Sequence, residues 1–437
     1  MKFSFPVGND IGNSEHDIYV DGVLIRQPNV FSQIGQLPWS DDEIDVQKNL
    51  ASIYDNLVVS IVSPAVPTGL YTVGKHALKT NGENVTTLYV KGNTPKSDQL
   101  GPYITTLAAI AGRAVEKAFK SGADVGEIQV TADMASDLPV KQHNPNNTIY
   151  MRNKFMGEKH NVTVHLGLTK KVDVRITFDF VQILQEGTPA IFALQMDSQG
   201  NWRKDKYDDA LVDEDEVVEP VSLFKEFSDT YELGDIDGSY LEGKNILHLD
   251  LGDGTADSPF TRGDAVDKDF CEGRNYGIAH AIDHAIPDLM TLAPSAFNSL
   301  SRQQYSEILK TQFSSGRKHK FLNEALQAFN PHCANQVSQV VKLANDQILN
   351  IGANEIDIIA VYGGGSILMK NQLYSQLKKL ADATRIQLFY VPADYAVTLN
   401  AEGLDYFVRS EIYVAIKAAY MAAKKKQKKD NAVAALD

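Results

Sequence analysis

The sequence predicts an α/β fold built from two related half-domains that face each other. Residues Ile246–Asp257 form an apolar run that ends in Asp250 and continues into a glycine-rich turn. The N-terminal stretch Phe3–Ser14 repeats this pattern around Asp10. A third stretch, Ile356–Ser366, is a buried strand by its composition and runs into three glycines. The repeated strand–Asp–x–Gly turn indicates that each half offers one turn to a shared polyphosphate.

The bulk composition is that of an ordinary soluble protein long enough for two or more domains, with 437 residues and a formal net charge of −14. This acidic balance argues against a general nucleic-acid binder. The two cysteines, Cys271 and Cys333, cannot build a disulfide framework or a cysteine-based zinc site, which favours a reducing compartment. We see no signal peptide and no apolar run of membrane-spanning length. We therefore expect a cytoplasmic protein that does not bind membranes.

The chemistry of the repeated turn suits a phosphate. Glycine permits positive φ angles and close approach, so backbone N–H groups can face a bound anion. A carboxylate beside such a cradle suits a hard cation such as Mg²⁺. The two turns consist of Gly12, Asn13 and Ser14 after Asp10, and of Gly252, Asp253, Gly254 and Thr255 after Asp250. Considered singly, either turn fits an ordinary hairpin equally well.

The patterns in the first half of the chain predict strands, then one helix, then further strands. Asp21-Gly22 predicts a hairpin between His16–Val20 and Val23–Ile25. Residues 31–95 predict a small subdomain that includes strands at Ile53–Ser63 and Leu70–Val73. Further along, apolar spacing predicts a helix over 102–120, a strand at 128–131, strict alternation over 160–184 and a strand-to-helix passage over 182–190.

The second half begins with a polar stretch in which residues 208–219 carry seven carboxylates. We interpret it as a solvated insertion, with an acidic contact for a basic partner as the alternative. The region 273–350 is helical by pattern, in two segments at Leu322–Phe329 and Gln336–Leu349. His280 and His284 have the i, i+4 spacing of some zinc sites but lack a recognisable third ligand.

Beyond the three glycines we expect a helix over Leu368–Leu380, a strand over Ile386–Val391 and a final helix over about 404–423. This β–turn–α–β unit has a glycine-rich crest on which a nucleotide can lie. It lacks the dinucleotide fingerprint, and the chain has no Walker A lysine motif. The lysine-rich run 424–429 is interpreted as a frayed basic tail.

The order of these pieces resembles the actin superfamily over nearly the whole chain. Residues 10–14 resemble its first phosphate motif, 182–190 its first connecting segment, 250–255 its second phosphate motif, 363–366 its adenosine motif and 400–403 its second connecting segment. Within the superfamily, the chain is most similar to bacterial actin-like proteins of the ParM type, which segregate plasmids. The opening Gly8–Ser14, the loop Lys96–Asp98 and the segment Thr398–Gly403 carry that closer resemblance.

The resemblance implies an actin-like two-lobe fold, made of duplicated ribonuclease-H-like domains, with ATP and Mg²⁺ in the interdomain cleft. The first lobe would comprise 1–180 with 395–437 and include the subdomain 31–95. The second lobe would comprise 181–394 and include a helical subdomain over about 262–354.

The resemblance also assigns roles to individual residues. Asp10 and Asp250 would organise Mg²⁺ and its waters. Glu186 would position or activate the attacking water, with Gln182 able to assist. The nucleotide would be bound by Gly12, Asn13, Ser14, Gly252, Asp253, Gly254, Thr255, Gly363, Gly364, Gly365 and Ser366.

By this resemblance, the protein would be an ATPase whose dynamic filaments segregate plasmid DNA. It would bind itself and a small DNA-binding adaptor protein on the plasmid centromere, and would not bind DNA directly. The alternatives are a sugar- or acetate-type small-molecule kinase of the same fold and another bacterial cytoskeletal actin homologue. A chaperone-type ATPase is disfavoured because no room follows the second lobe for a peptide-binding domain. A glycine-rich α/β protein without a nucleotide is the remaining alternative.

Overall fold

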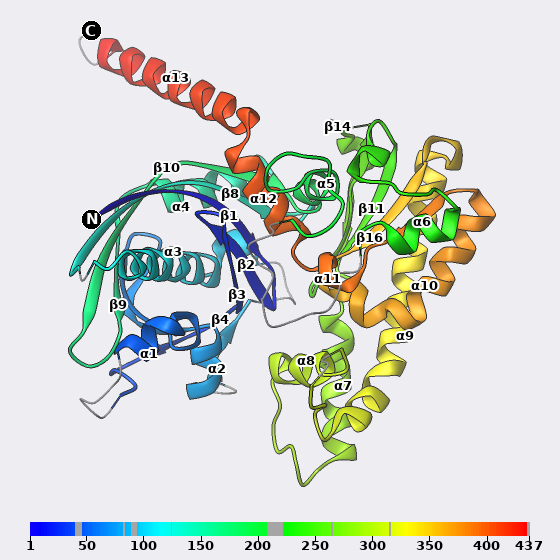
Figure 1. Cartoon of the computed structure of the whole chain (residues 1–437), viewed down its shortest axis with the longest axis horizontal. Helices are drawn as coiled ribbons and strands as arrows, with labels where there is room; N and C mark the ends of the chain where they lie inside the picture. The colour runs from blue at the N-terminus through cyan, green and yellow to red at the C-terminus, as the bar shows by residue number, and fades with distance from the viewer. Residues whose placement is uncertain are drawn as a thin grey trace.

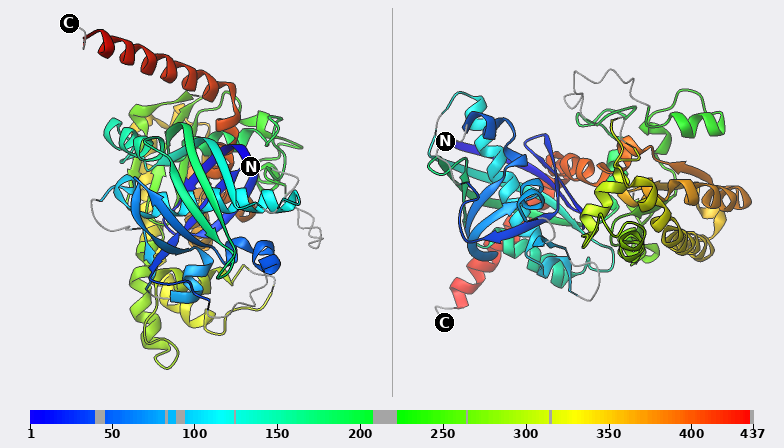
Figure 2. Two further views of the ribbon diagram at one scale, coloured as in Figure 1. Left: turned by 90° about the vertical axis from the view of Figure 1, so that its left-hand side faces the viewer. Right: turned by 90° about the horizontal axis from the view of Figure 1, so that it is seen from below.

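The computed structural model describes residues 1–39, 46–81, 84–88, 94–123, 125–207, 222–263, 265–313 and 316–434. The predicted acidic insertion at 208–219 lies outside the described residues. In the described part, no helix is both apolar and long enough to cross a bilayer. The chain forms two sheets, each with its own helices, which lie side by side in Figures 1 and 2.

The first sheet curves around helix α3 (Gly101–Lys120), whose side chains are buried along most of its length (Figure 1). The alternation predicted over 160–184 is confirmed, because β10 buries every second side chain over its first half. β1, β8 and β10 run parallel to one another. Within the described residues the strand order is β3 (Val23–Pro28), β2 (Glu15–Val20), β1 (Lys2–Ile11), β8 (Glu127–Leu138), β10 (Lys171–Gln185), β9 (His160–His165), β5 (Val58–Ser63), β6 (Val66–Val73), β4 (Val30–Ile34) and β7 (Thr86–Thr87).

The second sheet is centred on β11 (Ile246–Leu251), whose six side chains are all buried. β11 pairs antiparallel with β12 and β13 and parallel with β16. Its strands are β14 (Ala265–Val266), β13 (Phe260–Arg262), β11, β12 (Ala256–Ser258) and β15 (Glu272–Arg274), with β16 (Ile358–Tyr362) beside β11 and β17 (Gln387–Tyr390) beside β16.

The other helices cover these sheets and extend from them. In Figure 1, α7, α8 and α9 lie together below the second sheet. The helices are α1 (Val46–Ala51), α2 (Lys75–Asn81), α4 (Pro145–Met156), α5 (Thr188–Gln195), α6 (Lys225–Tyr231), α7 (Ala279–Leu292), α8 (Arg302–Lys310), α9 (Leu322–Ile351), α10 (Gly364–Thr384), α11 (Ala393–Ala396), α12 (Leu399–Arg409) and α13 (Glu411–Ala434).

The two repeated strand–Asp–x–Gly segments, here called cassettes, form hairpins of identical spacing. In the first hairpin Asp10 lies opposite Asp17, and in the second Asp250 lies opposite Asp257. Each hairpin is joined by a four-residue loop, 12–15 or 252–255. In each sheet the strand before this loop also has a parallel neighbour on its other side. The two halves are therefore related in local topology as well as in sequence.

Several predicted boundaries were wrong. The two helical segments at Leu322–Phe329 and Gln336–Leu349 are one helix, α9, which passes through Pro331. The buried residues Phe329, Cys333 and Val337 follow one another at intervals of four, so the same face of the helix is buried on both sides of the proline. The packing of this face outweighs the loss of one backbone hydrogen bond at Pro331.

The predicted final helix is two helices. α12 begins at Leu399 and thus contains the segment 400–403, and extended Ser410 separates it from α13. The predicted strand at Ile53–Ser63 begins only at Val58, because residues 53–55 form a 3-10 turn.

Helix α12 crosses between the two halves at backbone contact distance. A Cβ built on Gly403 would lie 1.8 Å from the Pro189 carbonyl oxygen of α5. On the neighbouring face, a Cβ on Gly8 of β1 would lie 2.3 Å from the Asp405 backbone nitrogen. Only glycine permits these approaches, so α12 is packed tightly against α5 and against β1.

We predict that Gly403→Ala lowers the free energy of unfolding by about 1–3 kcal/mol, because the added methyl group overpacks the crossing. Alanine is otherwise the better helix former, so propensity alone would give the opposite sign. Urea denaturation measures the effect. The matched control is Gly126→Ala, where a Cβ meets nothing within 4 Å. Equal stability of the two variants would contradict the tight crossing.

Candidate functional site

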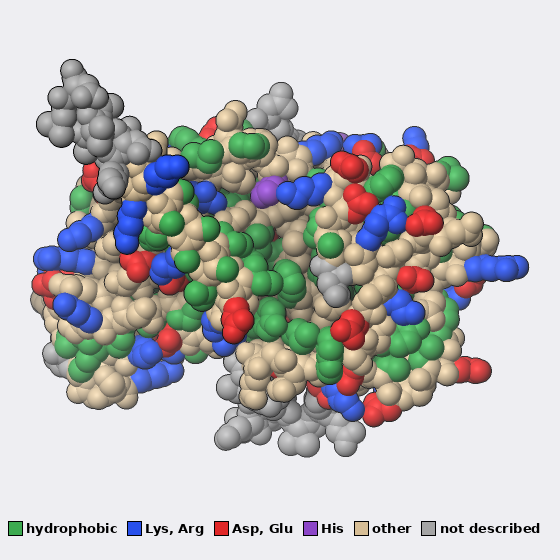
Figure 3. All heavy atoms as spheres, turned by 90° about the horizontal axis from the view of Figure 1, so that it is seen from above, with side chains coloured by type: hydrophobic (Ala, Val, Ile, Leu, Met, Phe, Trp, Pro, Cys, Tyr) green, Lys and Arg blue, Asp and Glu red, His purple; other side chains and the backbone are tan. Residues whose placement is uncertain are grey.

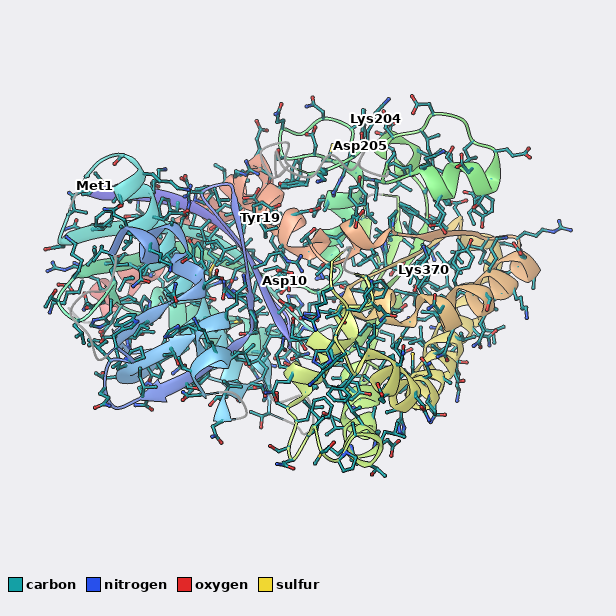
Figure 4. The ribbon with its side chains drawn as sticks, turned by 60° about the horizontal axis from the view of Figure 1, so that its bottom comes forward. Met1, Asp10, Tyr19, Lys204, Asp205 and Lys370 are labelled. Atoms are coloured by element: carbon teal, nitrogen blue, oxygen red, sulfur yellow. The ribbon has the colours of Figure 1, made fainter. Side chains whose placement is uncertain are left out.

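A cavity of about 1370 Å³ lies between the two hairpins and extends toward α2 and α8. Figure 4 shows Asp10 near the middle of the molecule, where the first half meets the second. The predicted site residues that line the cavity are Asp10, Gly12, Asn13, Ser14, Glu186, Asp250, Gly252, Asp253, Thr255, Gly363, Gly364 and Gly365. Three others, Gln182, Gly254 and Ser366, are not among its lining residues.

The first turn is braced from behind. The Asn29 side-chain amide donates to the Gly12 carbonyl oxygen at 2.6 Å. A Cβ on Gly12 would lie 2.7 Å from the Glu15 carbonyl oxygen, so the tight turn requires glycine. Behind it, the buried Asn9 side chain accepts from His16 at 2.7 Å. Burial lowers the pKa of His16 to about 3, so this histidine is neutral at physiological pH.

The second turn rests on the N-terminus of α7. The carbonyl oxygens of Gly252, Asp253 and Gly254 accept from the backbone N–H groups of Ile278, Ala279 and Gly277. In a trans peptide the N–H points opposite to the carbonyl of the same unit. The N–H groups of residues 253–255 therefore point away from α7. This orientation is compatible with the anion cradle that the glycine-rich sequence predicts.

The two turns approach each other across the cavity, because the Ser14 side chain lies near the Asp253 carboxyl group and lowers its pKa. Burial raises the pKa of Asp253, and nearby Arg302, at 3.6 Å, opposes this rise. A group that binds both turns would replace or reinforce the contact between Ser14 and Asp253.

The glycine crest packs directly against the second turn. Gly363 has φ +88°, and a Cβ there would lie 2.6 Å from the Asp250 carboxylate. A Cβ on Gly365 would lie 2.8 Å from the Gly252 carbonyl oxygen. Ser366 is buried one residue deeper, where its hydroxyl donates to the Gly363 carbonyl oxygen at 2.7 Å. The crest also begins the long helix α10, whose N-terminal partial charge favours an anion.

Glu186 lies just beyond β10, on a turn held by both halves. Its N–H donates to the Leu138 carbonyl oxygen at 2.8 Å. The next residue, Gly187, has φ +80°, and its carbonyl oxygen accepts from the Tyr362 hydroxyl at 3.2 Å. A Cβ on Gly187 would lie 2.7 Å from the Pro259 ring. The position of Glu186 therefore depends on packing against the second sheet.

Lys96 forms an ion pair with Glu186, and both side chains are largely buried. Burial alone would lower the pKa of Lys96, but Glu186 and Asp137 outweigh this effect and raise it. The lysine backbone N–H donates to the Gln142 side chain at 2.7 Å, which fixes the 3-10 helix Lys96–Asp98. The sequence predicted this loop only as a family feature, without a role for its lysine.

Carboxylates crowd the floor of the cavity. Burial is the main cause of their raised pKa values, which reach about 7 for Asp250 and about 8 for Asp257. Burial, together with their mutual repulsion, also raises the pKa of Asp10 and of Asp137 well above the ordinary value. Both carboxylate oxygens of Asp137 are buried without a hydrogen-bond partner. Such a set of hard oxygen donors lacks positive charge and fits a divalent cation such as Mg²⁺.

No group of three or more His, Cys, Asp or Glu side chains among the described residues is arranged to hold a metal by itself. Mg²⁺ commonly binds through one or two carboxylates, waters and substrate phosphates, so a complete protein cage is not required. The predicted zinc alternative gains no third ligand. His284 stacks on His332, and His332 pairs with Asp288 at 2.8 Å.

No protein-family model matches the sequence, and no curated protein matches it. Solved structures do match it over nearly its whole length. The actin-like protein Alp7A has a TM-score of 0.63 at 16% identity, and the alignment covers 98% of this chain and 100% of that one. A 15-stranded ParM filament from Clostridium botulinum gives 0.56 at 15%, covering 93% and 99%. Bacillus thuringiensis ParM with ATP gives 0.53 at 14%, covering 94% and 99%.

The protein has the actin-like fold. The predicted resemblance to ParM-type actin-like proteins is thereby confirmed at the level of the fold, with the two-lobe α/β architecture that it implies. At 14–16% identity these structures establish the fold alone. Any proposal about activity is therefore argued from the residues in the cavity.

Sequence reasoning missed four residues in or directly beside the cavity. Asp17 and Asp257 each lie seven residues after the first aspartate of a cassette, and this second repeat was a usable signal. Asn400 donates to the Asp250 carboxylate at 2.7 Å and had appeared only as part of a connecting segment. No sequence pattern marked Asp137, because a single polar residue near the end of a strand is common and belongs to no motif.

The side chain of Gln182 forms its hydrogen bonds with residues other than Glu186. Its side-chain oxygen accepts from Arg152 at 3.1 Å, and its amide donates to the Ile183 carbonyl oxygen at 3.2 Å. Arg152 in turn lies over the rings of Phe180 and Tyr420. These contacts direct Gln182 toward α4 and α13.

We predict that the stability of the protein without nucleotide or metal falls as pH rises from about 5 to 8. A carboxyl group whose pKa is raised on folding binds its proton more tightly in the folded state than in the unfolded state. This tighter binding stabilises the fold at low pH, and the stabilisation is lost as pH rises toward the folded pKa, which is about 8 for Asp257. Asp257→Asn should flatten the slope by up to about 1.4 kcal/mol per pH unit, as expected for one proton.

Urea denaturation at several pH values measures this slope. The asparagine can still accept from the Val140 N–H, which bonds to the carboxylate at 3.0 Å. The exposed Asp346→Asn on α9 is the control and should keep the wild-type slope. An Asp257→Asn variant whose slope equals that of the wild type would refute the assignment.

Proposed function

We propose that the protein is an Mg²⁺-dependent ATPase that polymerises as bacterial actin-like proteins do. One observation carries this proposal. Two hairpins of equal spacing present glycine turns to one cavity, and desolvated carboxylates lie beneath those turns. The actin-like fold, shared with Bacillus thuringiensis ParM solved with ATP, supports a nucleotide as the ligand.

The proposed binding roles follow the position of each residue. Asp10 and Asp250 organise Mg²⁺ and its waters, with Asp137 and Asp257 adding negative charge below them. Gly363, Gly364, Gly365 and Ser366 shape the crest that supports the nucleoside. The phosphates are held by the turn residues Gly12, Asn13, Ser14, Gly252, Asp253, Gly254 and Thr255.

Glu186 is proposed to orient and deprotonate the attacking water. Phosphoryl transfer to water needs in-line positioning and neutralisation of charge more than covalent chemistry. Glu186 lies at the cavity wall, and its turn is held at Leu138 and Tyr362. Lys96 restrains the carboxylate in the nucleotide-free protein and supplies the positive charge nearest to it. Gln182 is proposed to assist indirectly, by holding Arg152 beside β10.

The proposed cellular role is plasmid segregation by dynamic filaments in the cytoplasm. A small DNA-binding adaptor on the plasmid centromere would link filament to DNA, so the acidic protein itself binds neither DNA nor membrane. The 15-stranded ParM filament from Clostridium botulinum, whose subunit has the same fold, supports self-assembly. We propose lobes at 1–180 with 395–437 and at 181–394, with subdomains near 31–95 and 262–354.

We predict that Glu186→Ala slows phosphate release by about 10²–10⁴-fold, because a positioned general base is lost. Binding should survive, since the turns and the cation ligands are intact. Phosphate release and the thermal shift with saturating Mg-ATP measure the two effects. The exposed Glu158→Ala is the control and should match the wild type. Wild-type turnover in Glu186→Ala would remove Glu186 from the mechanism.

We predict that Mg-ATP raises light scattering through filament formation and that the filaments persist longer in Glu186→Ala. Sedimentation and electron microscopy check this result, with Mg-ADP as the matched condition. Monomers at every salt and protein concentration, together with ATP turnover, would instead favour a small-molecule kinase.

A further inference from the structure

Helix α13 is anchored to the first sheet by its N-terminal turns. Its first turns pack on the first sheet, where the Tyr413 hydroxyl donates to the Phe180 carbonyl oxygen at 2.8 Å and Lys417 pairs with Asp133 at 2.7 Å. Among the described side chains of α13, Tyr420 makes the last ring contact with the sheet, with its centroid 5.0 Å from that of Phe180. From Ala422 through Gln427 every side chain is exposed. Figures 1 and 2 show the rest of the helix projecting from the body.

A projecting segment of this kind gains stability from a partner. The helix continues to Ala434, so about 20 Å of it follows Tyr420 at ~1.5 Å per residue. Isolated helices of roughly this length are marginal in water. At its base Ile412 and Val414 expose 55% and 61% of their surface. The projecting part therefore has both the shape and the surface of an interaction element.

The charge of this element is opposite to that of the chain as a whole. Lys424, Lys425 and Lys426 are exposed on it. By contrast, residues 205–242 carry fourteen carboxylates and two lysines, which accounts for most of the formal charge of −14. The most basic and the most acidic segments of the chain are thus far apart in the sequence.

The described part of the acidic segment forms a surface on and beyond α6. We call it the acidic face, and it consists of the exposed carboxylates Glu226, Asp229, Glu232 and Asp235. Three of them pair with lysines, but these pairs are exposed and weakly held. Figure 4 places Lys204, Asp205 and Lys370 on the same half of the molecule as α6. The four carboxylates and these three lysines together leave one net negative charge on the face, and the exposed pairs can exchange partners.

The acidic face and α13 cannot meet within one molecule. α13 starts on the first sheet and points away from the second, whereas α6 lies on the opposite side (Figure 1). Figure 3 shows charged side chains of both signs on both halves, so the complementarity is specific to α13 and the acidic face. Complementary surfaces on one chain that cannot close on themselves suit a contact between copies.

We propose that the projecting part of α13 binds the acidic face of a second copy of this chain. The contact is heterologous, so each bound copy still offers one free helix and one free acidic face, and the assembly can grow without closing. The inference deepens the proposed filament function and rests on it. Because the contact is largely electrostatic and exposed, assembly should weaken as salt concentration rises.

A charge-swap experiment on the full-length protein tests this interface. Lys424→Glu, Lys425→Glu and Lys426→Glu together should raise the critical concentration for Mg-ATP assembly by about tenfold or more, through like-charge repulsion. Adding Asp229→Lys, Glu232→Lys and Asp235→Lys to the same chain should restore it to within about threefold, because both sides of the contact are then reversed. Sedimentation measures each value.

The control reverses three exposed lysines on the first half, Lys48→Glu, Lys159→Glu and Lys171→Glu, with the same change in net charge. It should assemble like the wild type, and all variants should keep the wild-type melting temperature. Tail reversal without effect, or a swap that does not restore assembly, overturns the interface. So does a tail variant that assembles normally but loses retention on DNA or on anionic vesicles, because the helix then serves a polyanion.

The same measurements separate this inference from the function on which it rests. A wild-type protein that forms no polymer with any nucleotide overturns the filament proposal and the interface with it. A wild-type protein that polymerises beside an equally competent tail variant overturns the interface alone.

Discussion

The structure depends on a cluster of carboxyl groups that are desolvated by burial. Asp10, Asp250 and Asp257 line one cavity, the buried Asp137 adds its charge from behind them, and Lys96 is paired with Glu186 at the cavity edge. Charges buried without partners are costly, so the nucleotide-free protein keeps several of these carboxyl groups protonated through their raised pKa values. A bound divalent cation would remove that cost. The fold thus concentrates negative charge at the point where, in the proposed function, nucleotide phosphates and Mg²⁺ would bind.

Close backbone packing makes this arrangement possible. Gly363 and Gly365 let the crest touch the second turn, while Gly403 lets α12 cross α5 at contact distance. The same helix reaches the cavity through Asn400, which donates to Asp250. α12 is therefore connected to the cavity floor and to both halves. A change in the relative position of the halves must be accommodated around this helix, because interfaces packed at backbone distance shift as units.

The two halves are alike in their hairpins but not in their chemistry. Each provides a glycine turn and a pair of aspartates, which is the part that binds phosphate and cation in the proposed function. Glu186 and Lys96, by contrast, come from the first sheet and the loop before α3. The second half contributes Tyr362 and Pro259, which hold the turn after Glu186. In the proposed function, a duplicated binding element is thus combined with the carboxylate of Glu186, whose position depends on contact between both halves.

The sequence by itself determined the two cassettes, the crest, the position of Glu186 after its strand and the α/β class, because these are local patterns of apolar period, glycine and charge. It did not determine that the helix through Pro331 is continuous, that α12 and α13 separate at Ser410, or that Asp137 joins the site. Those features depend on contacts between residues far apart in the chain. Packing can override a local helix breaker, and a carboxylate becomes unusual only when folding removes its water and brings other carboxylates beside it.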